Sequence, residues 1–238
     1  MTIPLQINTL LFDLDGTLTY QYPTSLDIMF TLLDERQIPL MATAHRDTLQ
    51  YVFRYWANSD ELTHDMEKYG KFSEEHWVQY LKRKLIAAGL NDIQAADLAP
   101  ILQPIIVERY QPDKMVLEDV KPTLKNLRTQ GYTMGLVTNR SAPVDEELEK
   151  YGFIPYFDFY FAAGEIDIWK PDPGIFEHAL YLAGSDPEET TYIGDNFLTD
   201  VVGARNAGLH PILYDPRNTF PDADCQVITK IGSLCSQM

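Results

Sequence analysis

The sequence predicts an α/β protein whose parallel sheet is accompanied by a second, all-helical unit. From about residue 119 onward, short apolar segments alternate with segments whose apolar residues recur every three or four positions. This alternation is typical of β–α units in a parallel sheet covered by helices on both faces. Between about residues 23 and 112 only the helical spacing occurs, so this stretch is expected to form a separate unit.

The first expected strand is residues 8–13, an apolar run that ends in Asp13. Asp15 follows two positions later, and the turn-forming Gly16 comes directly after it. Because side chains alternate between the faces of a strand, Asp13 and Asp15 are expected to point the same way, with Leu14 on the packed side. Two like charges at that range require a neutralising cation or a shared proton, so the pair indicates chemistry rather than packing.

Four helices are expected in the middle of the chain. Their apolar residues recur at three- and four-residue spacings, and no convincing strand interrupts them. Gly89 is expected to end the third helix, and Pro112 to close the fourth. The expected ranges are 25–37, 41–57, 73–88 and 93–110.

The remaining chain is expected to complete the sheet and its helical layers. The expected strands are 132–138, 158–162, 190–194 and 209–213. The expected helices are 121–130, 143–151, 173–183 and 199–207. Open α/β sheets bind ligands at the carboxyl ends of their strands, so the residues that follow these strands are expected to meet there.

The composition fits a globular protein and limits its partners. Of the 238 residues 45% are apolar, which is enough for a sizeable core in one large or two unequal domains. A formal net charge of −16 argues against nucleic acid as a partner, because binding its backbone needs clustered lysine and arginine. Neither a membrane span nor a signal peptide is predicted, so we expect a cytoplasmic protein with no membrane partner. Cys225 and Cys235 are accordingly expected to be reduced thiols.

Polar residues suited to binding a phosphoryl group follow three more of the expected strands. Thr138 and Asn139 supply a hydroxyl and an amide, and Lys170 lies in an extended turn before a helix. Asp195 and Asp200 flank the start of another helix. Each element alone has an ordinary explanation as a cap, a turn or a surface cation. Together with the first acidic pair they form a set suited to a hard cation and a phosphoryl group.

The order of these elements resembles the haloacid dehalogenase (HAD) superfamily, all four of whose motifs are matched. Asp13-Leu14-Asp15-Gly16-Thr17 resembles the first motif, and residues 194–200 resemble the last one, including its spacing. The resemblance implies a Rossmann-like core domain, built from residues 1–19 and 116–238. It also implies that residues 20–115 form an all-helical cap domain.

The resemblance also implies a catalytic set of Asp13, Asp15, Thr138 and Lys170. Asp13 would attack phosphorus and form an aspartyl-phosphate, while Asp15 would act as general acid and then as general base. Thr138 and Asn139 would hold the phosphoryl oxygens. Lys170 would also bind these oxygens and offset the charge on the nucleophile.

Mg²⁺ is the cofactor that the resemblance implies, because it prefers oxygen ligands and keeps a place for a phosphate oxygen. Its ligands would be the carboxylates of Asp13 and Asp195 and the backbone carbonyl of Asp15. Asp200 would bind a metal-bound water or orient Lys170.

These residues lead us to expect a magnesium-dependent phosphatase of the hydrolase class, acting on a small phosphorylated metabolite. A sugar phosphate, a nucleotide or a phosphoglycolate-like ester would fit, and the protein is expected to be a monomer or a homodimer. Three alternatives stay open: a sugar-phosphate phosphomutase, a haloacid dehalogenase and a non-catalytic phosphate-binding protein. Asp15 disfavours the dehalogenase, since dehalogenases of the family are not expected to carry a metal-dependent acid there.

The residues that select the substrate are expected in the helical segment, where no motif marks them. Polar side chains there are candidates to touch the leaving group, although each is more often a solvated helix residue: His45, Arg46, Arg54, His64, His76 and Arg109. Aromatic residues of the second helix are expected to pack in a core, with a base-stacking nucleotide pocket as the alternative: Tyr51, Phe53, Tyr55 and Trp56. Arg140 is expected near the catalytic set as an additional cation.

Overall fold

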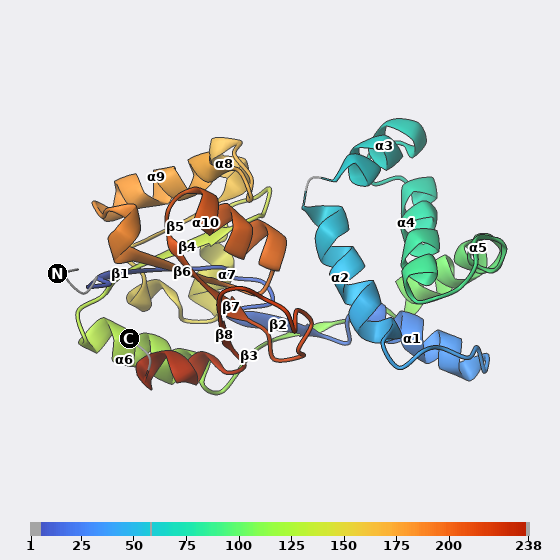
Figure 1. Ribbon diagram of the computed structural model, residues 1–238, viewed down its shortest axis with the longest axis horizontal. Helices are drawn as coiled ribbons and strands as arrows, with labels where there is room; N and C mark the ends of the chain where they lie inside the picture. Colours follow the sequence, from blue (N-terminus) through green and yellow to red (C-terminus); the bar gives the residue numbers. More distant parts are fainter. Residues whose placement is uncertain (1–5, 58, 237–238) are drawn as a thin grey trace. The chain divides into compact units, whose positions relative to one another are not determined.

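The computed structural model describes residues 6–57 and 59–236, which form two compact units (Figure 1). One unit comprises the residues up to 20 together with those from 115 onward, and the other comprises residues 21–114. The chain passes between the units in strands β2 (Thr19–Tyr22) and β3 (Asp113–Val116), which are hydrogen-bonded neighbours in a two-stranded sheet. These two strands were not expected from the sequence.

A six-stranded sheet forms the centre of the first unit, with the strand order β5-β4-β1-β6-β7-β8. All five neighbouring pairs are parallel, which confirms the predicted Rossmann-like α/β fold. The strands are β1 (Thr9–Phe12), β4 (Thr133–Thr138), β5 (Phe159–Ala162), β6 (Thr190–Gly194), β7 (His210–Tyr214) and β8 (Gln226–Ile228). The last of these was not expected, because it has three residues and two of them are exposed.

Helices cover both faces of this sheet, as Figure 1 shows for α6 on one side and α9 and α10 on the other. Leu10 and Phe12 of β1 point to the face where α6 packs, and Leu11 points to the face of α9 and α10. Burial on both faces explains why β1 is a continuous apolar run. The α-helices are α6 (Val120–Thr129), α7 (Asp145–Lys150), α8 (Ala163–Ile166), α9 (Pro173–Ala183) and α10 (Gly203–Asn206).

The helix expected at 199–207 begins instead with a π-helical turn at Phe197–Val202, which leads into α10. Asn196 caps this turn, because its side-chain oxygen accepts from the backbone N–H of Leu198 at 2.9 Å and of Thr199 at 3.2 Å. Short 3-10 segments lie at Ile154–Tyr156, Pro187–Glu189 and Ile231–Ser236.

The second unit contains helices α1 to α5. They are α1 (Ser25–Glu35), α2 (Ala44–Trp56), α3 (Asp60–Tyr69), α4 (Glu74–Ala87) and α5 (Asp92–Arg109). Helix α3 was not expected, because only Leu62 and Asp65 of its ten residues are buried and its apolar spacing is therefore weak. Its start is nonetheless encoded locally, since the Ser59 hydroxyl accepts from the backbone N–H of Leu62 at 3.1 Å.

Two apolar clusters hold the helical unit together. One joins α1, α4 and α5, and the other is aromatic and centres on Tyr55 and Tyr80, whose rings stack with their centroids 4.6 Å apart. None of the helices in the described part of the chain combines the length and apolar character needed to cross a membrane. The role of this unit as a cap stays a prediction.

Candidate active site

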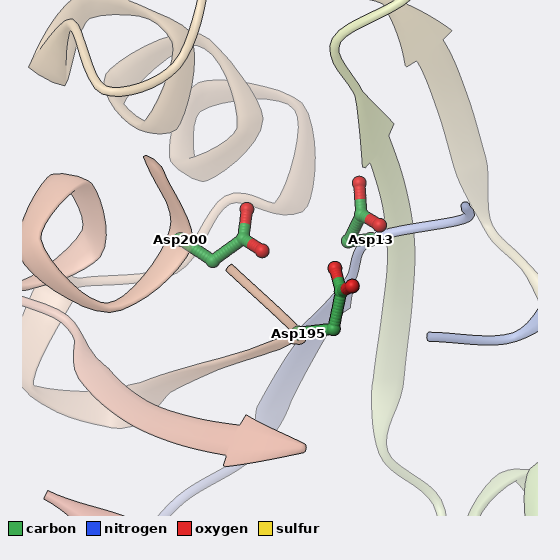
Figure 2. Close-up of side chains that lie close together, drawn as sticks. All are labelled: Asp13, Asp195 and Asp200. Atoms are coloured by element: carbon green, nitrogen blue, oxygen red, sulfur yellow. The ribbon is translucent and has the colours of Figure 1, made fainter. Parts of the chain in front are cut away.

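Three carboxylates gather at the carboxyl edge of the parallel sheet (Figure 2). Asp13 follows β1, and its backbone N–H donates to the carbonyl of Ile193 at 2.9 Å, which continues the pairing of β1 with β6. Asp195 follows β6, and Asp200 lies in the π-helical turn. One oxygen of each carboxylate lies within 4.8 Å of the others, so the structure brings these three sequence-predicted residues together.

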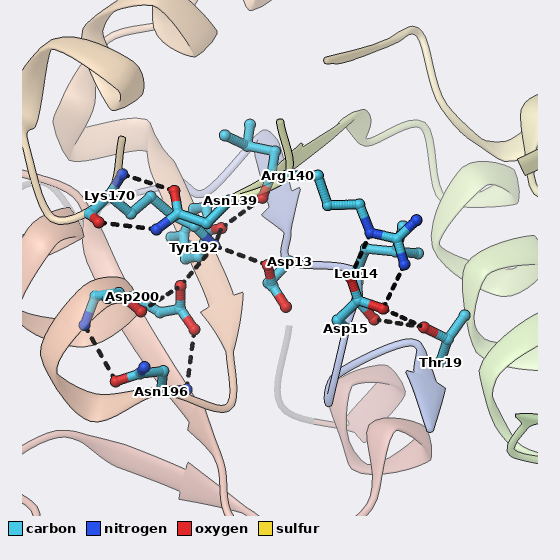
Figure 3. Close-up of polar contacts among 12 residues, drawn as sticks. Asp13, Leu14, Asp15, Thr19, Asn139, Arg140, Lys170, Tyr192, Asn196 and Asp200 are labelled. Carbon is cyan, nitrogen blue, oxygen red and sulfur yellow. Dashed lines mark hydrogen bonds and ion pairs between the residues drawn. The ribbon is translucent and has the colours of Figure 1, made fainter. Parts of the chain in front are cut away.

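The ammonium of Lys170 bridges two of these carboxylates (Figure 3). Its Nζ lies 2.7 Å from Asp13 Oδ1, 2.7 Å from Asp200 Oδ1 and 2.7 Å from the hydroxyl of Tyr192. An ammonium has three N–H donors, and protein oxygens occupy three positions around this one. Lys170 is 2% exposed, so its charge acts on the carboxylates with little screening by water.

The charges of the cluster do not balance. Burial raises the pKa of Asp13 to about 7, even though the charge of Lys170 opposes the rise. Burial, followed by the charges of Asp13 and Asp200, raises the pKa of Asp195 well above its usual range. Three carboxylates around one ammonium therefore favour an additional cation or the uptake of protons. Because the donor set consists of carboxylate oxygens, it fits a hard divalent cation.

Two glycines allow the acidic side chains to lie this close to the backbone. Gly16 has a φ of +88°, and a Cβ there would lie 2.2 Å from Asp195 Oδ2. A Cβ at Gly194 would lie 2.3 Å from Asp200 Oδ2. Both distances are shorter than any van der Waals contact, so larger residues at either position would displace a carboxylate of the cluster.

Thr138 and Asn139 lie at the carboxyl end of β4, as expected, but the amide of Asn139 has a different partner from the expected one. Its Nδ2 donates to the carbonyl of Lys170 at 2.8 Å, and its Oδ1 accepts from the N–H of Lys170 at 2.8 Å. Asn139 therefore holds the backbone that carries the bridging ammonium. Thr138 is buried at the strand end, and its contact with a phosphoryl oxygen stays a prediction.

Asp15 lies beside the cluster, with Arg140 as its partner. The Nε of Arg140 donates to Asp15 Oδ2 at 2.6 Å, and Nη2 donates to Oδ1 at 2.8 Å. The side chain of Asp15 is 41% exposed, against 8% for Asp13, so the two acids differ in environment. The strand ends at Phe12, and simple alternation therefore does not describe the turn that carries Asp15. Leu14 is fully buried, as expected.

The candidates in the helical unit have diverse surroundings. The expectation that His76 is a solvated residue or touches a leaving group is wrong, because it is fully buried among aromatic rings. Neither of its ring nitrogens has a hydrogen-bond partner among the described residues. The other candidates have neighbours within the unit or are exposed: His45 stacks on Phe30, Arg46 lies near Asp47, Arg54 lies over Tyr51, Arg109 pairs with Glu35, and His64 is exposed.

The aromatic residues of α2 largely confirm the expectation of core packing. Tyr55 is fully buried, and Tyr51 and Trp56 pack against the same aromatic cluster. The phenol of Tyr55 donates to Asp65, which also forms a two-bond ion pair with Arg83. Phe53 is half-buried.

Several residues of the site were not singled out in the sequence. Tyr192 lies in the buried strand β6, where tyrosine is a common residue. Its position in the sequence therefore gives no sign that its hydroxyl contacts Lys170. Glu147, which binds Arg140, lies among the acidic residues that begin α7. A glutamate there has a sufficient local explanation, since acids stabilise the amino-terminal turn of a helix.

Comparisons of the sequence and of the structure with known proteins point to the same family. A family model described as haloacid dehalogenase-like hydrolase matches residues 7–208. The chain is 29% identical to haloacid dehalogenase-like hydrolase domain-containing protein 3 of Bos taurus, over 88% of this chain and 82% of that protein. It is 30% identical to a glyceraldehyde 3-phosphate phosphatase of Methanopyrus kandleri, over 85% of this chain and 82% of that protein. A 2-haloacid dehalogenase from Pseudomonas syringae has a similar structure, with a TM-score of 0.54, 26% identity and 97% of each chain covered.

Proposed function

Because this chain belongs to the haloacid dehalogenase-like hydrolase family, we propose that it is a magnesium-dependent phosphatase that cleaves a small phosphate ester. One observation carries the proposal: the Lys170 ammonium binds Asp13 within a cluster of three carboxylates whose charge is not balanced. The similarity to a phosphatase over most of both chains supports phosphate esters as the substrate class.

We assign Asp13 as the nucleophile. Its carboxylate would attack phosphorus, and the bond between phosphorus and the leaving oxygen would break to give an aspartyl-phosphate and an alkoxide. The hydrogen bond from Lys170 at 2.7 Å fixes Asp13 Oδ1 and favours the ionised form that attacks. Burial of both partners keeps this orientation, which removes much of the entropic cost of reaching the reactive geometry.

We assign Asp15 as the general acid and base. In the first step it would give its proton to the leaving alkoxide, and in the second it would take a proton from the water that attacks the aspartyl-phosphate. The second step would break the bond between phosphorus and Asp13 and release inorganic phosphate. The partial exposure of Asp15 suits a group that exchanges protons with water.

The carboxylate oxygens of the cluster fit Mg²⁺, which Asp13 and Asp195 would hold. We assign the backbone carbonyl of Asp15 as a further ligand. Asp200 is bonded to Lys170 and to the backbone N–H of Asn196, so we assign it to positioning Lys170. When bound, the ion would supply positive charge to the phosphoryl oxygens. Thr138 would donate to the same oxygens.

We assign the helical unit, residues 21–114, the role of a cap that selects the leaving group. The core motifs account for the reaction but contain no group that would distinguish one alcohol from another. The unit has two apolar cores of its own, which maintain its fold. Residues outside these cores can therefore vary to suit a particular leaving group.

The test is hydrolysis of 4-nitrophenyl phosphate and of a panel of sugar phosphates, nucleotides and phosphoglycolate, with release of inorganic phosphate as the readout. We expect turnover with Mg²⁺ and none with EDTA, and D13N is expected to abolish turnover while keeping the melting temperature. D224N is the matched control, because Asp224 is an exposed acid of the same unit that pairs with Arg205.

Four outcomes would contradict the proposal. Full activity of D13N, or full activity in EDTA, would exclude the mechanism. Halide release from 2-haloacids without phosphatase activity would instead favour a dehalogenase, and phosphate transfer between sugar positions with little free phosphate would favour a mutase.

A further inference from the structure

Arg140 pairs with the carboxylate of Asp15 (Figure 3) and, on its other side, with a second carboxylate, that of Glu147. Two of its nitrogens donate to the two oxygens of Asp15, at 2.6 and 2.8 Å. On its other side Nη1 donates to Glu147 Oε2, and Nη2 lies 3.4 Å from Glu147 Oε1. A planar guanidinium that is hydrogen-bonded along both of its edges has little freedom to rotate. The side chains of Arg140, Asp15 and Glu147 therefore form one rigid group.

The backbone beneath Arg140 is also fixed. Asn139, the preceding residue, holds the backbone of Lys170 through two hydrogen bonds of 2.8 Å. The carbonyl of Arg140 accepts from the N–H of Gly164 at 2.9 Å. A Cβ at Gly164 would lie 2.2 Å from the carbonyl oxygen of Ser141, so these two segments approach as closely as glycine permits. The guanidinium therefore extends from an anchored position.

We propose that Arg140 is a positioning residue that fixes the orientation of the Asp15 carboxylate, and that Glu147 holds Arg140 in place. This inference rests on the proposed function, in which Asp15 delivers a proton to the leaving oxygen. As the bond between phosphorus and that oxygen breaks, its electron pair stays on the oxygen and takes up the proton of Asp15. Delivery requires the carboxyl oxygen to face the leaving group, and the bidentate contact sets the plane in which both oxygens lie.

The surroundings of Arg140 argue against a direct role in binding the phosphate. A guanidinium has five N–H donors, and four contacts to carboxylate oxygens occupy most of them. With these donors directed at carboxylates, Arg140 has few left for a phosphoryl group, whereas a phosphate-binding arginine offers it unpaired donors.

The leaving group distinguishes the two roles. 4-Nitrophenolate is stable without a proton, and its departure depends little on the orientation of Asp15. An alkoxide needs the proton, so an alkyl phosphate reports on that orientation. R140Q is expected to lower kcat/KM for an alkyl phosphate by about tenfold more than for 4-nitrophenyl phosphate, within the range that general acids contribute. The ratio of the two losses is the measured quantity.

Three further variants complete the experiment. R140K keeps the positive charge but lacks the planar guanidinium that binds two oxygens at once. Its ratio of losses for the two esters is expected to resemble that of R140Q rather than that of the wild type. E147Q weakens the hold on Arg140 and is expected to change the ratio in the same direction by a smaller factor, which keeps the test available if R140Q fails to fold. R205Q is the matched control, since Arg205 contacts both carboxylate oxygens of Asp224 on the surface of the same unit.

Equal losses for both esters in R140Q and E147Q would overturn the inference, as would full rescue by R140K. A loss confined to KM, with weaker inhibition by inorganic phosphate, would assign Arg140 to phosphate binding instead. Failure of the wild-type protein to hydrolyse either ester would count against the proposed function. A wild-type enzyme whose leaving-group preference is unchanged in these variants would count against the role of Arg140 alone.

Discussion

The hydroxyl of Tyr192 lies 2.7 Å from the ammonium of Lys170 and donates to the carbonyl of Val137 at 2.9 Å. Tyr192 belongs to β6, so its hydroxyl connects this strand both to the segment that carries Lys170 and to strand β4, which carries Val137. Both side chains are buried, and burial without an acceptor would disfavour the charge of Lys170. Tyr192 thus supplies the one neutral oxygen among the three oxygens around this ammonium.

Replacing Tyr192 by phenylalanine is expected to lower the free energy of unfolding by about 1–3 kcal/mol, because a buried ammonium loses an acceptor. It should also lower kcat more than it raises KM, since Lys170 would hold Asp13 less firmly. Urea unfolding and steady-state kinetics measure the two effects. Y160F is the control, because the Tyr160 hydroxyl contacts the exposed Asp145; equal behaviour of the two variants would contradict the expectation.

Replacing Gly16 by alanine is expected to abolish most activity. The new Cβ would lie 2.2 Å from Asp195 Oδ2, so the carboxylate must move, and affinity for Mg²⁺ should fall with it. The positive φ adds strain of roughly 1–2 kcal/mol. Kinetics over a range of Mg²⁺ concentrations would show a higher requirement for the metal.

The variant G131A distinguishes the effect of backbone strain at a positive φ from the effect of the collision between the new Cβ and Asp195. Gly131 has a φ of +91°, close to the +88° of Gly16, but a Cβ there would meet nothing within 4 Å. This variant should lose a similar amount of stability and keep its activity. Loss of activity in both variants would attribute the effect to general destabilisation.

Asn139 provides a test of whether its amide holds the protein or the phosphate. If it holds the Lys170 segment, N139A should lose about 1–3 kcal/mol of stability, because the backbone N–H and carbonyl of Lys170 lose their partners. The inhibition constant of inorganic phosphate should change little. A large rise in that constant, with stability unchanged, would instead favour the prediction that this amide binds phosphoryl oxygens.

Lys84 of α4 is expected to make the stability of the protein depend on alkaline pH. Burial lowers its pKa from 10.5 to about 8, and its ammonium lies 4.6 Å from the centre of the Tyr80 ring. Between pH 8 and 10.5 the unfolded chain therefore binds more protons than the folded one, and this contribution to stability rises with pH. Below pH 8 both states are charged and the full cost of burial, roughly 3 kcal/mol before any gain from the ring, applies.

The variant K84M should consequently be more stable than the wild type at pH 7, and the difference should shrink as the pH approaches 10.5. The free energy of unfolding in urea at several pH values measures it. K82M is the control, since Lys82 is partly exposed and pairs with Asp92 at 2.8 Å. A constant difference between K84M and the wild type across this range would contradict the assignment.

The parts of the fold that could be predicted are those that local patterns encode. Strands such as β1 are continuous apolar runs because both faces of the sheet are covered, and the acids that follow β1 and β6 meet because these strands are parallel neighbours. Helix α3 was missed because its ten residues bury one apolar side chain, and β8 because three residues show no period.

The partners of individual polar groups could not be predicted. Asp15 and Arg140 are 125 positions apart, and Asn139 and Lys170 are 31 apart, so their pairing depends on how the strands are placed in three dimensions. His76 is of a polar residue type that is usually exposed, but aromatic residues pack around it and bury it fully. Such environments arise from packing between elements, which no spacing along the chain records.

The pairing of β2 with β3 has a consequence for how the chain tolerates change. Because these strands are hydrogen-bonded neighbours, the first and last residues of the helical insertion start and finish near each other. Seen from the six-stranded sheet that carries the candidate site, the insertion begins and ends at neighbouring positions, as a closed loop does. The free-energy cost of closing a flexible loop grows slowly, by about 0.6 kcal/mol for each doubling of the loop's length. Insertions of other lengths and sequences could thus replace this one with little penalty to the remainder of the protein.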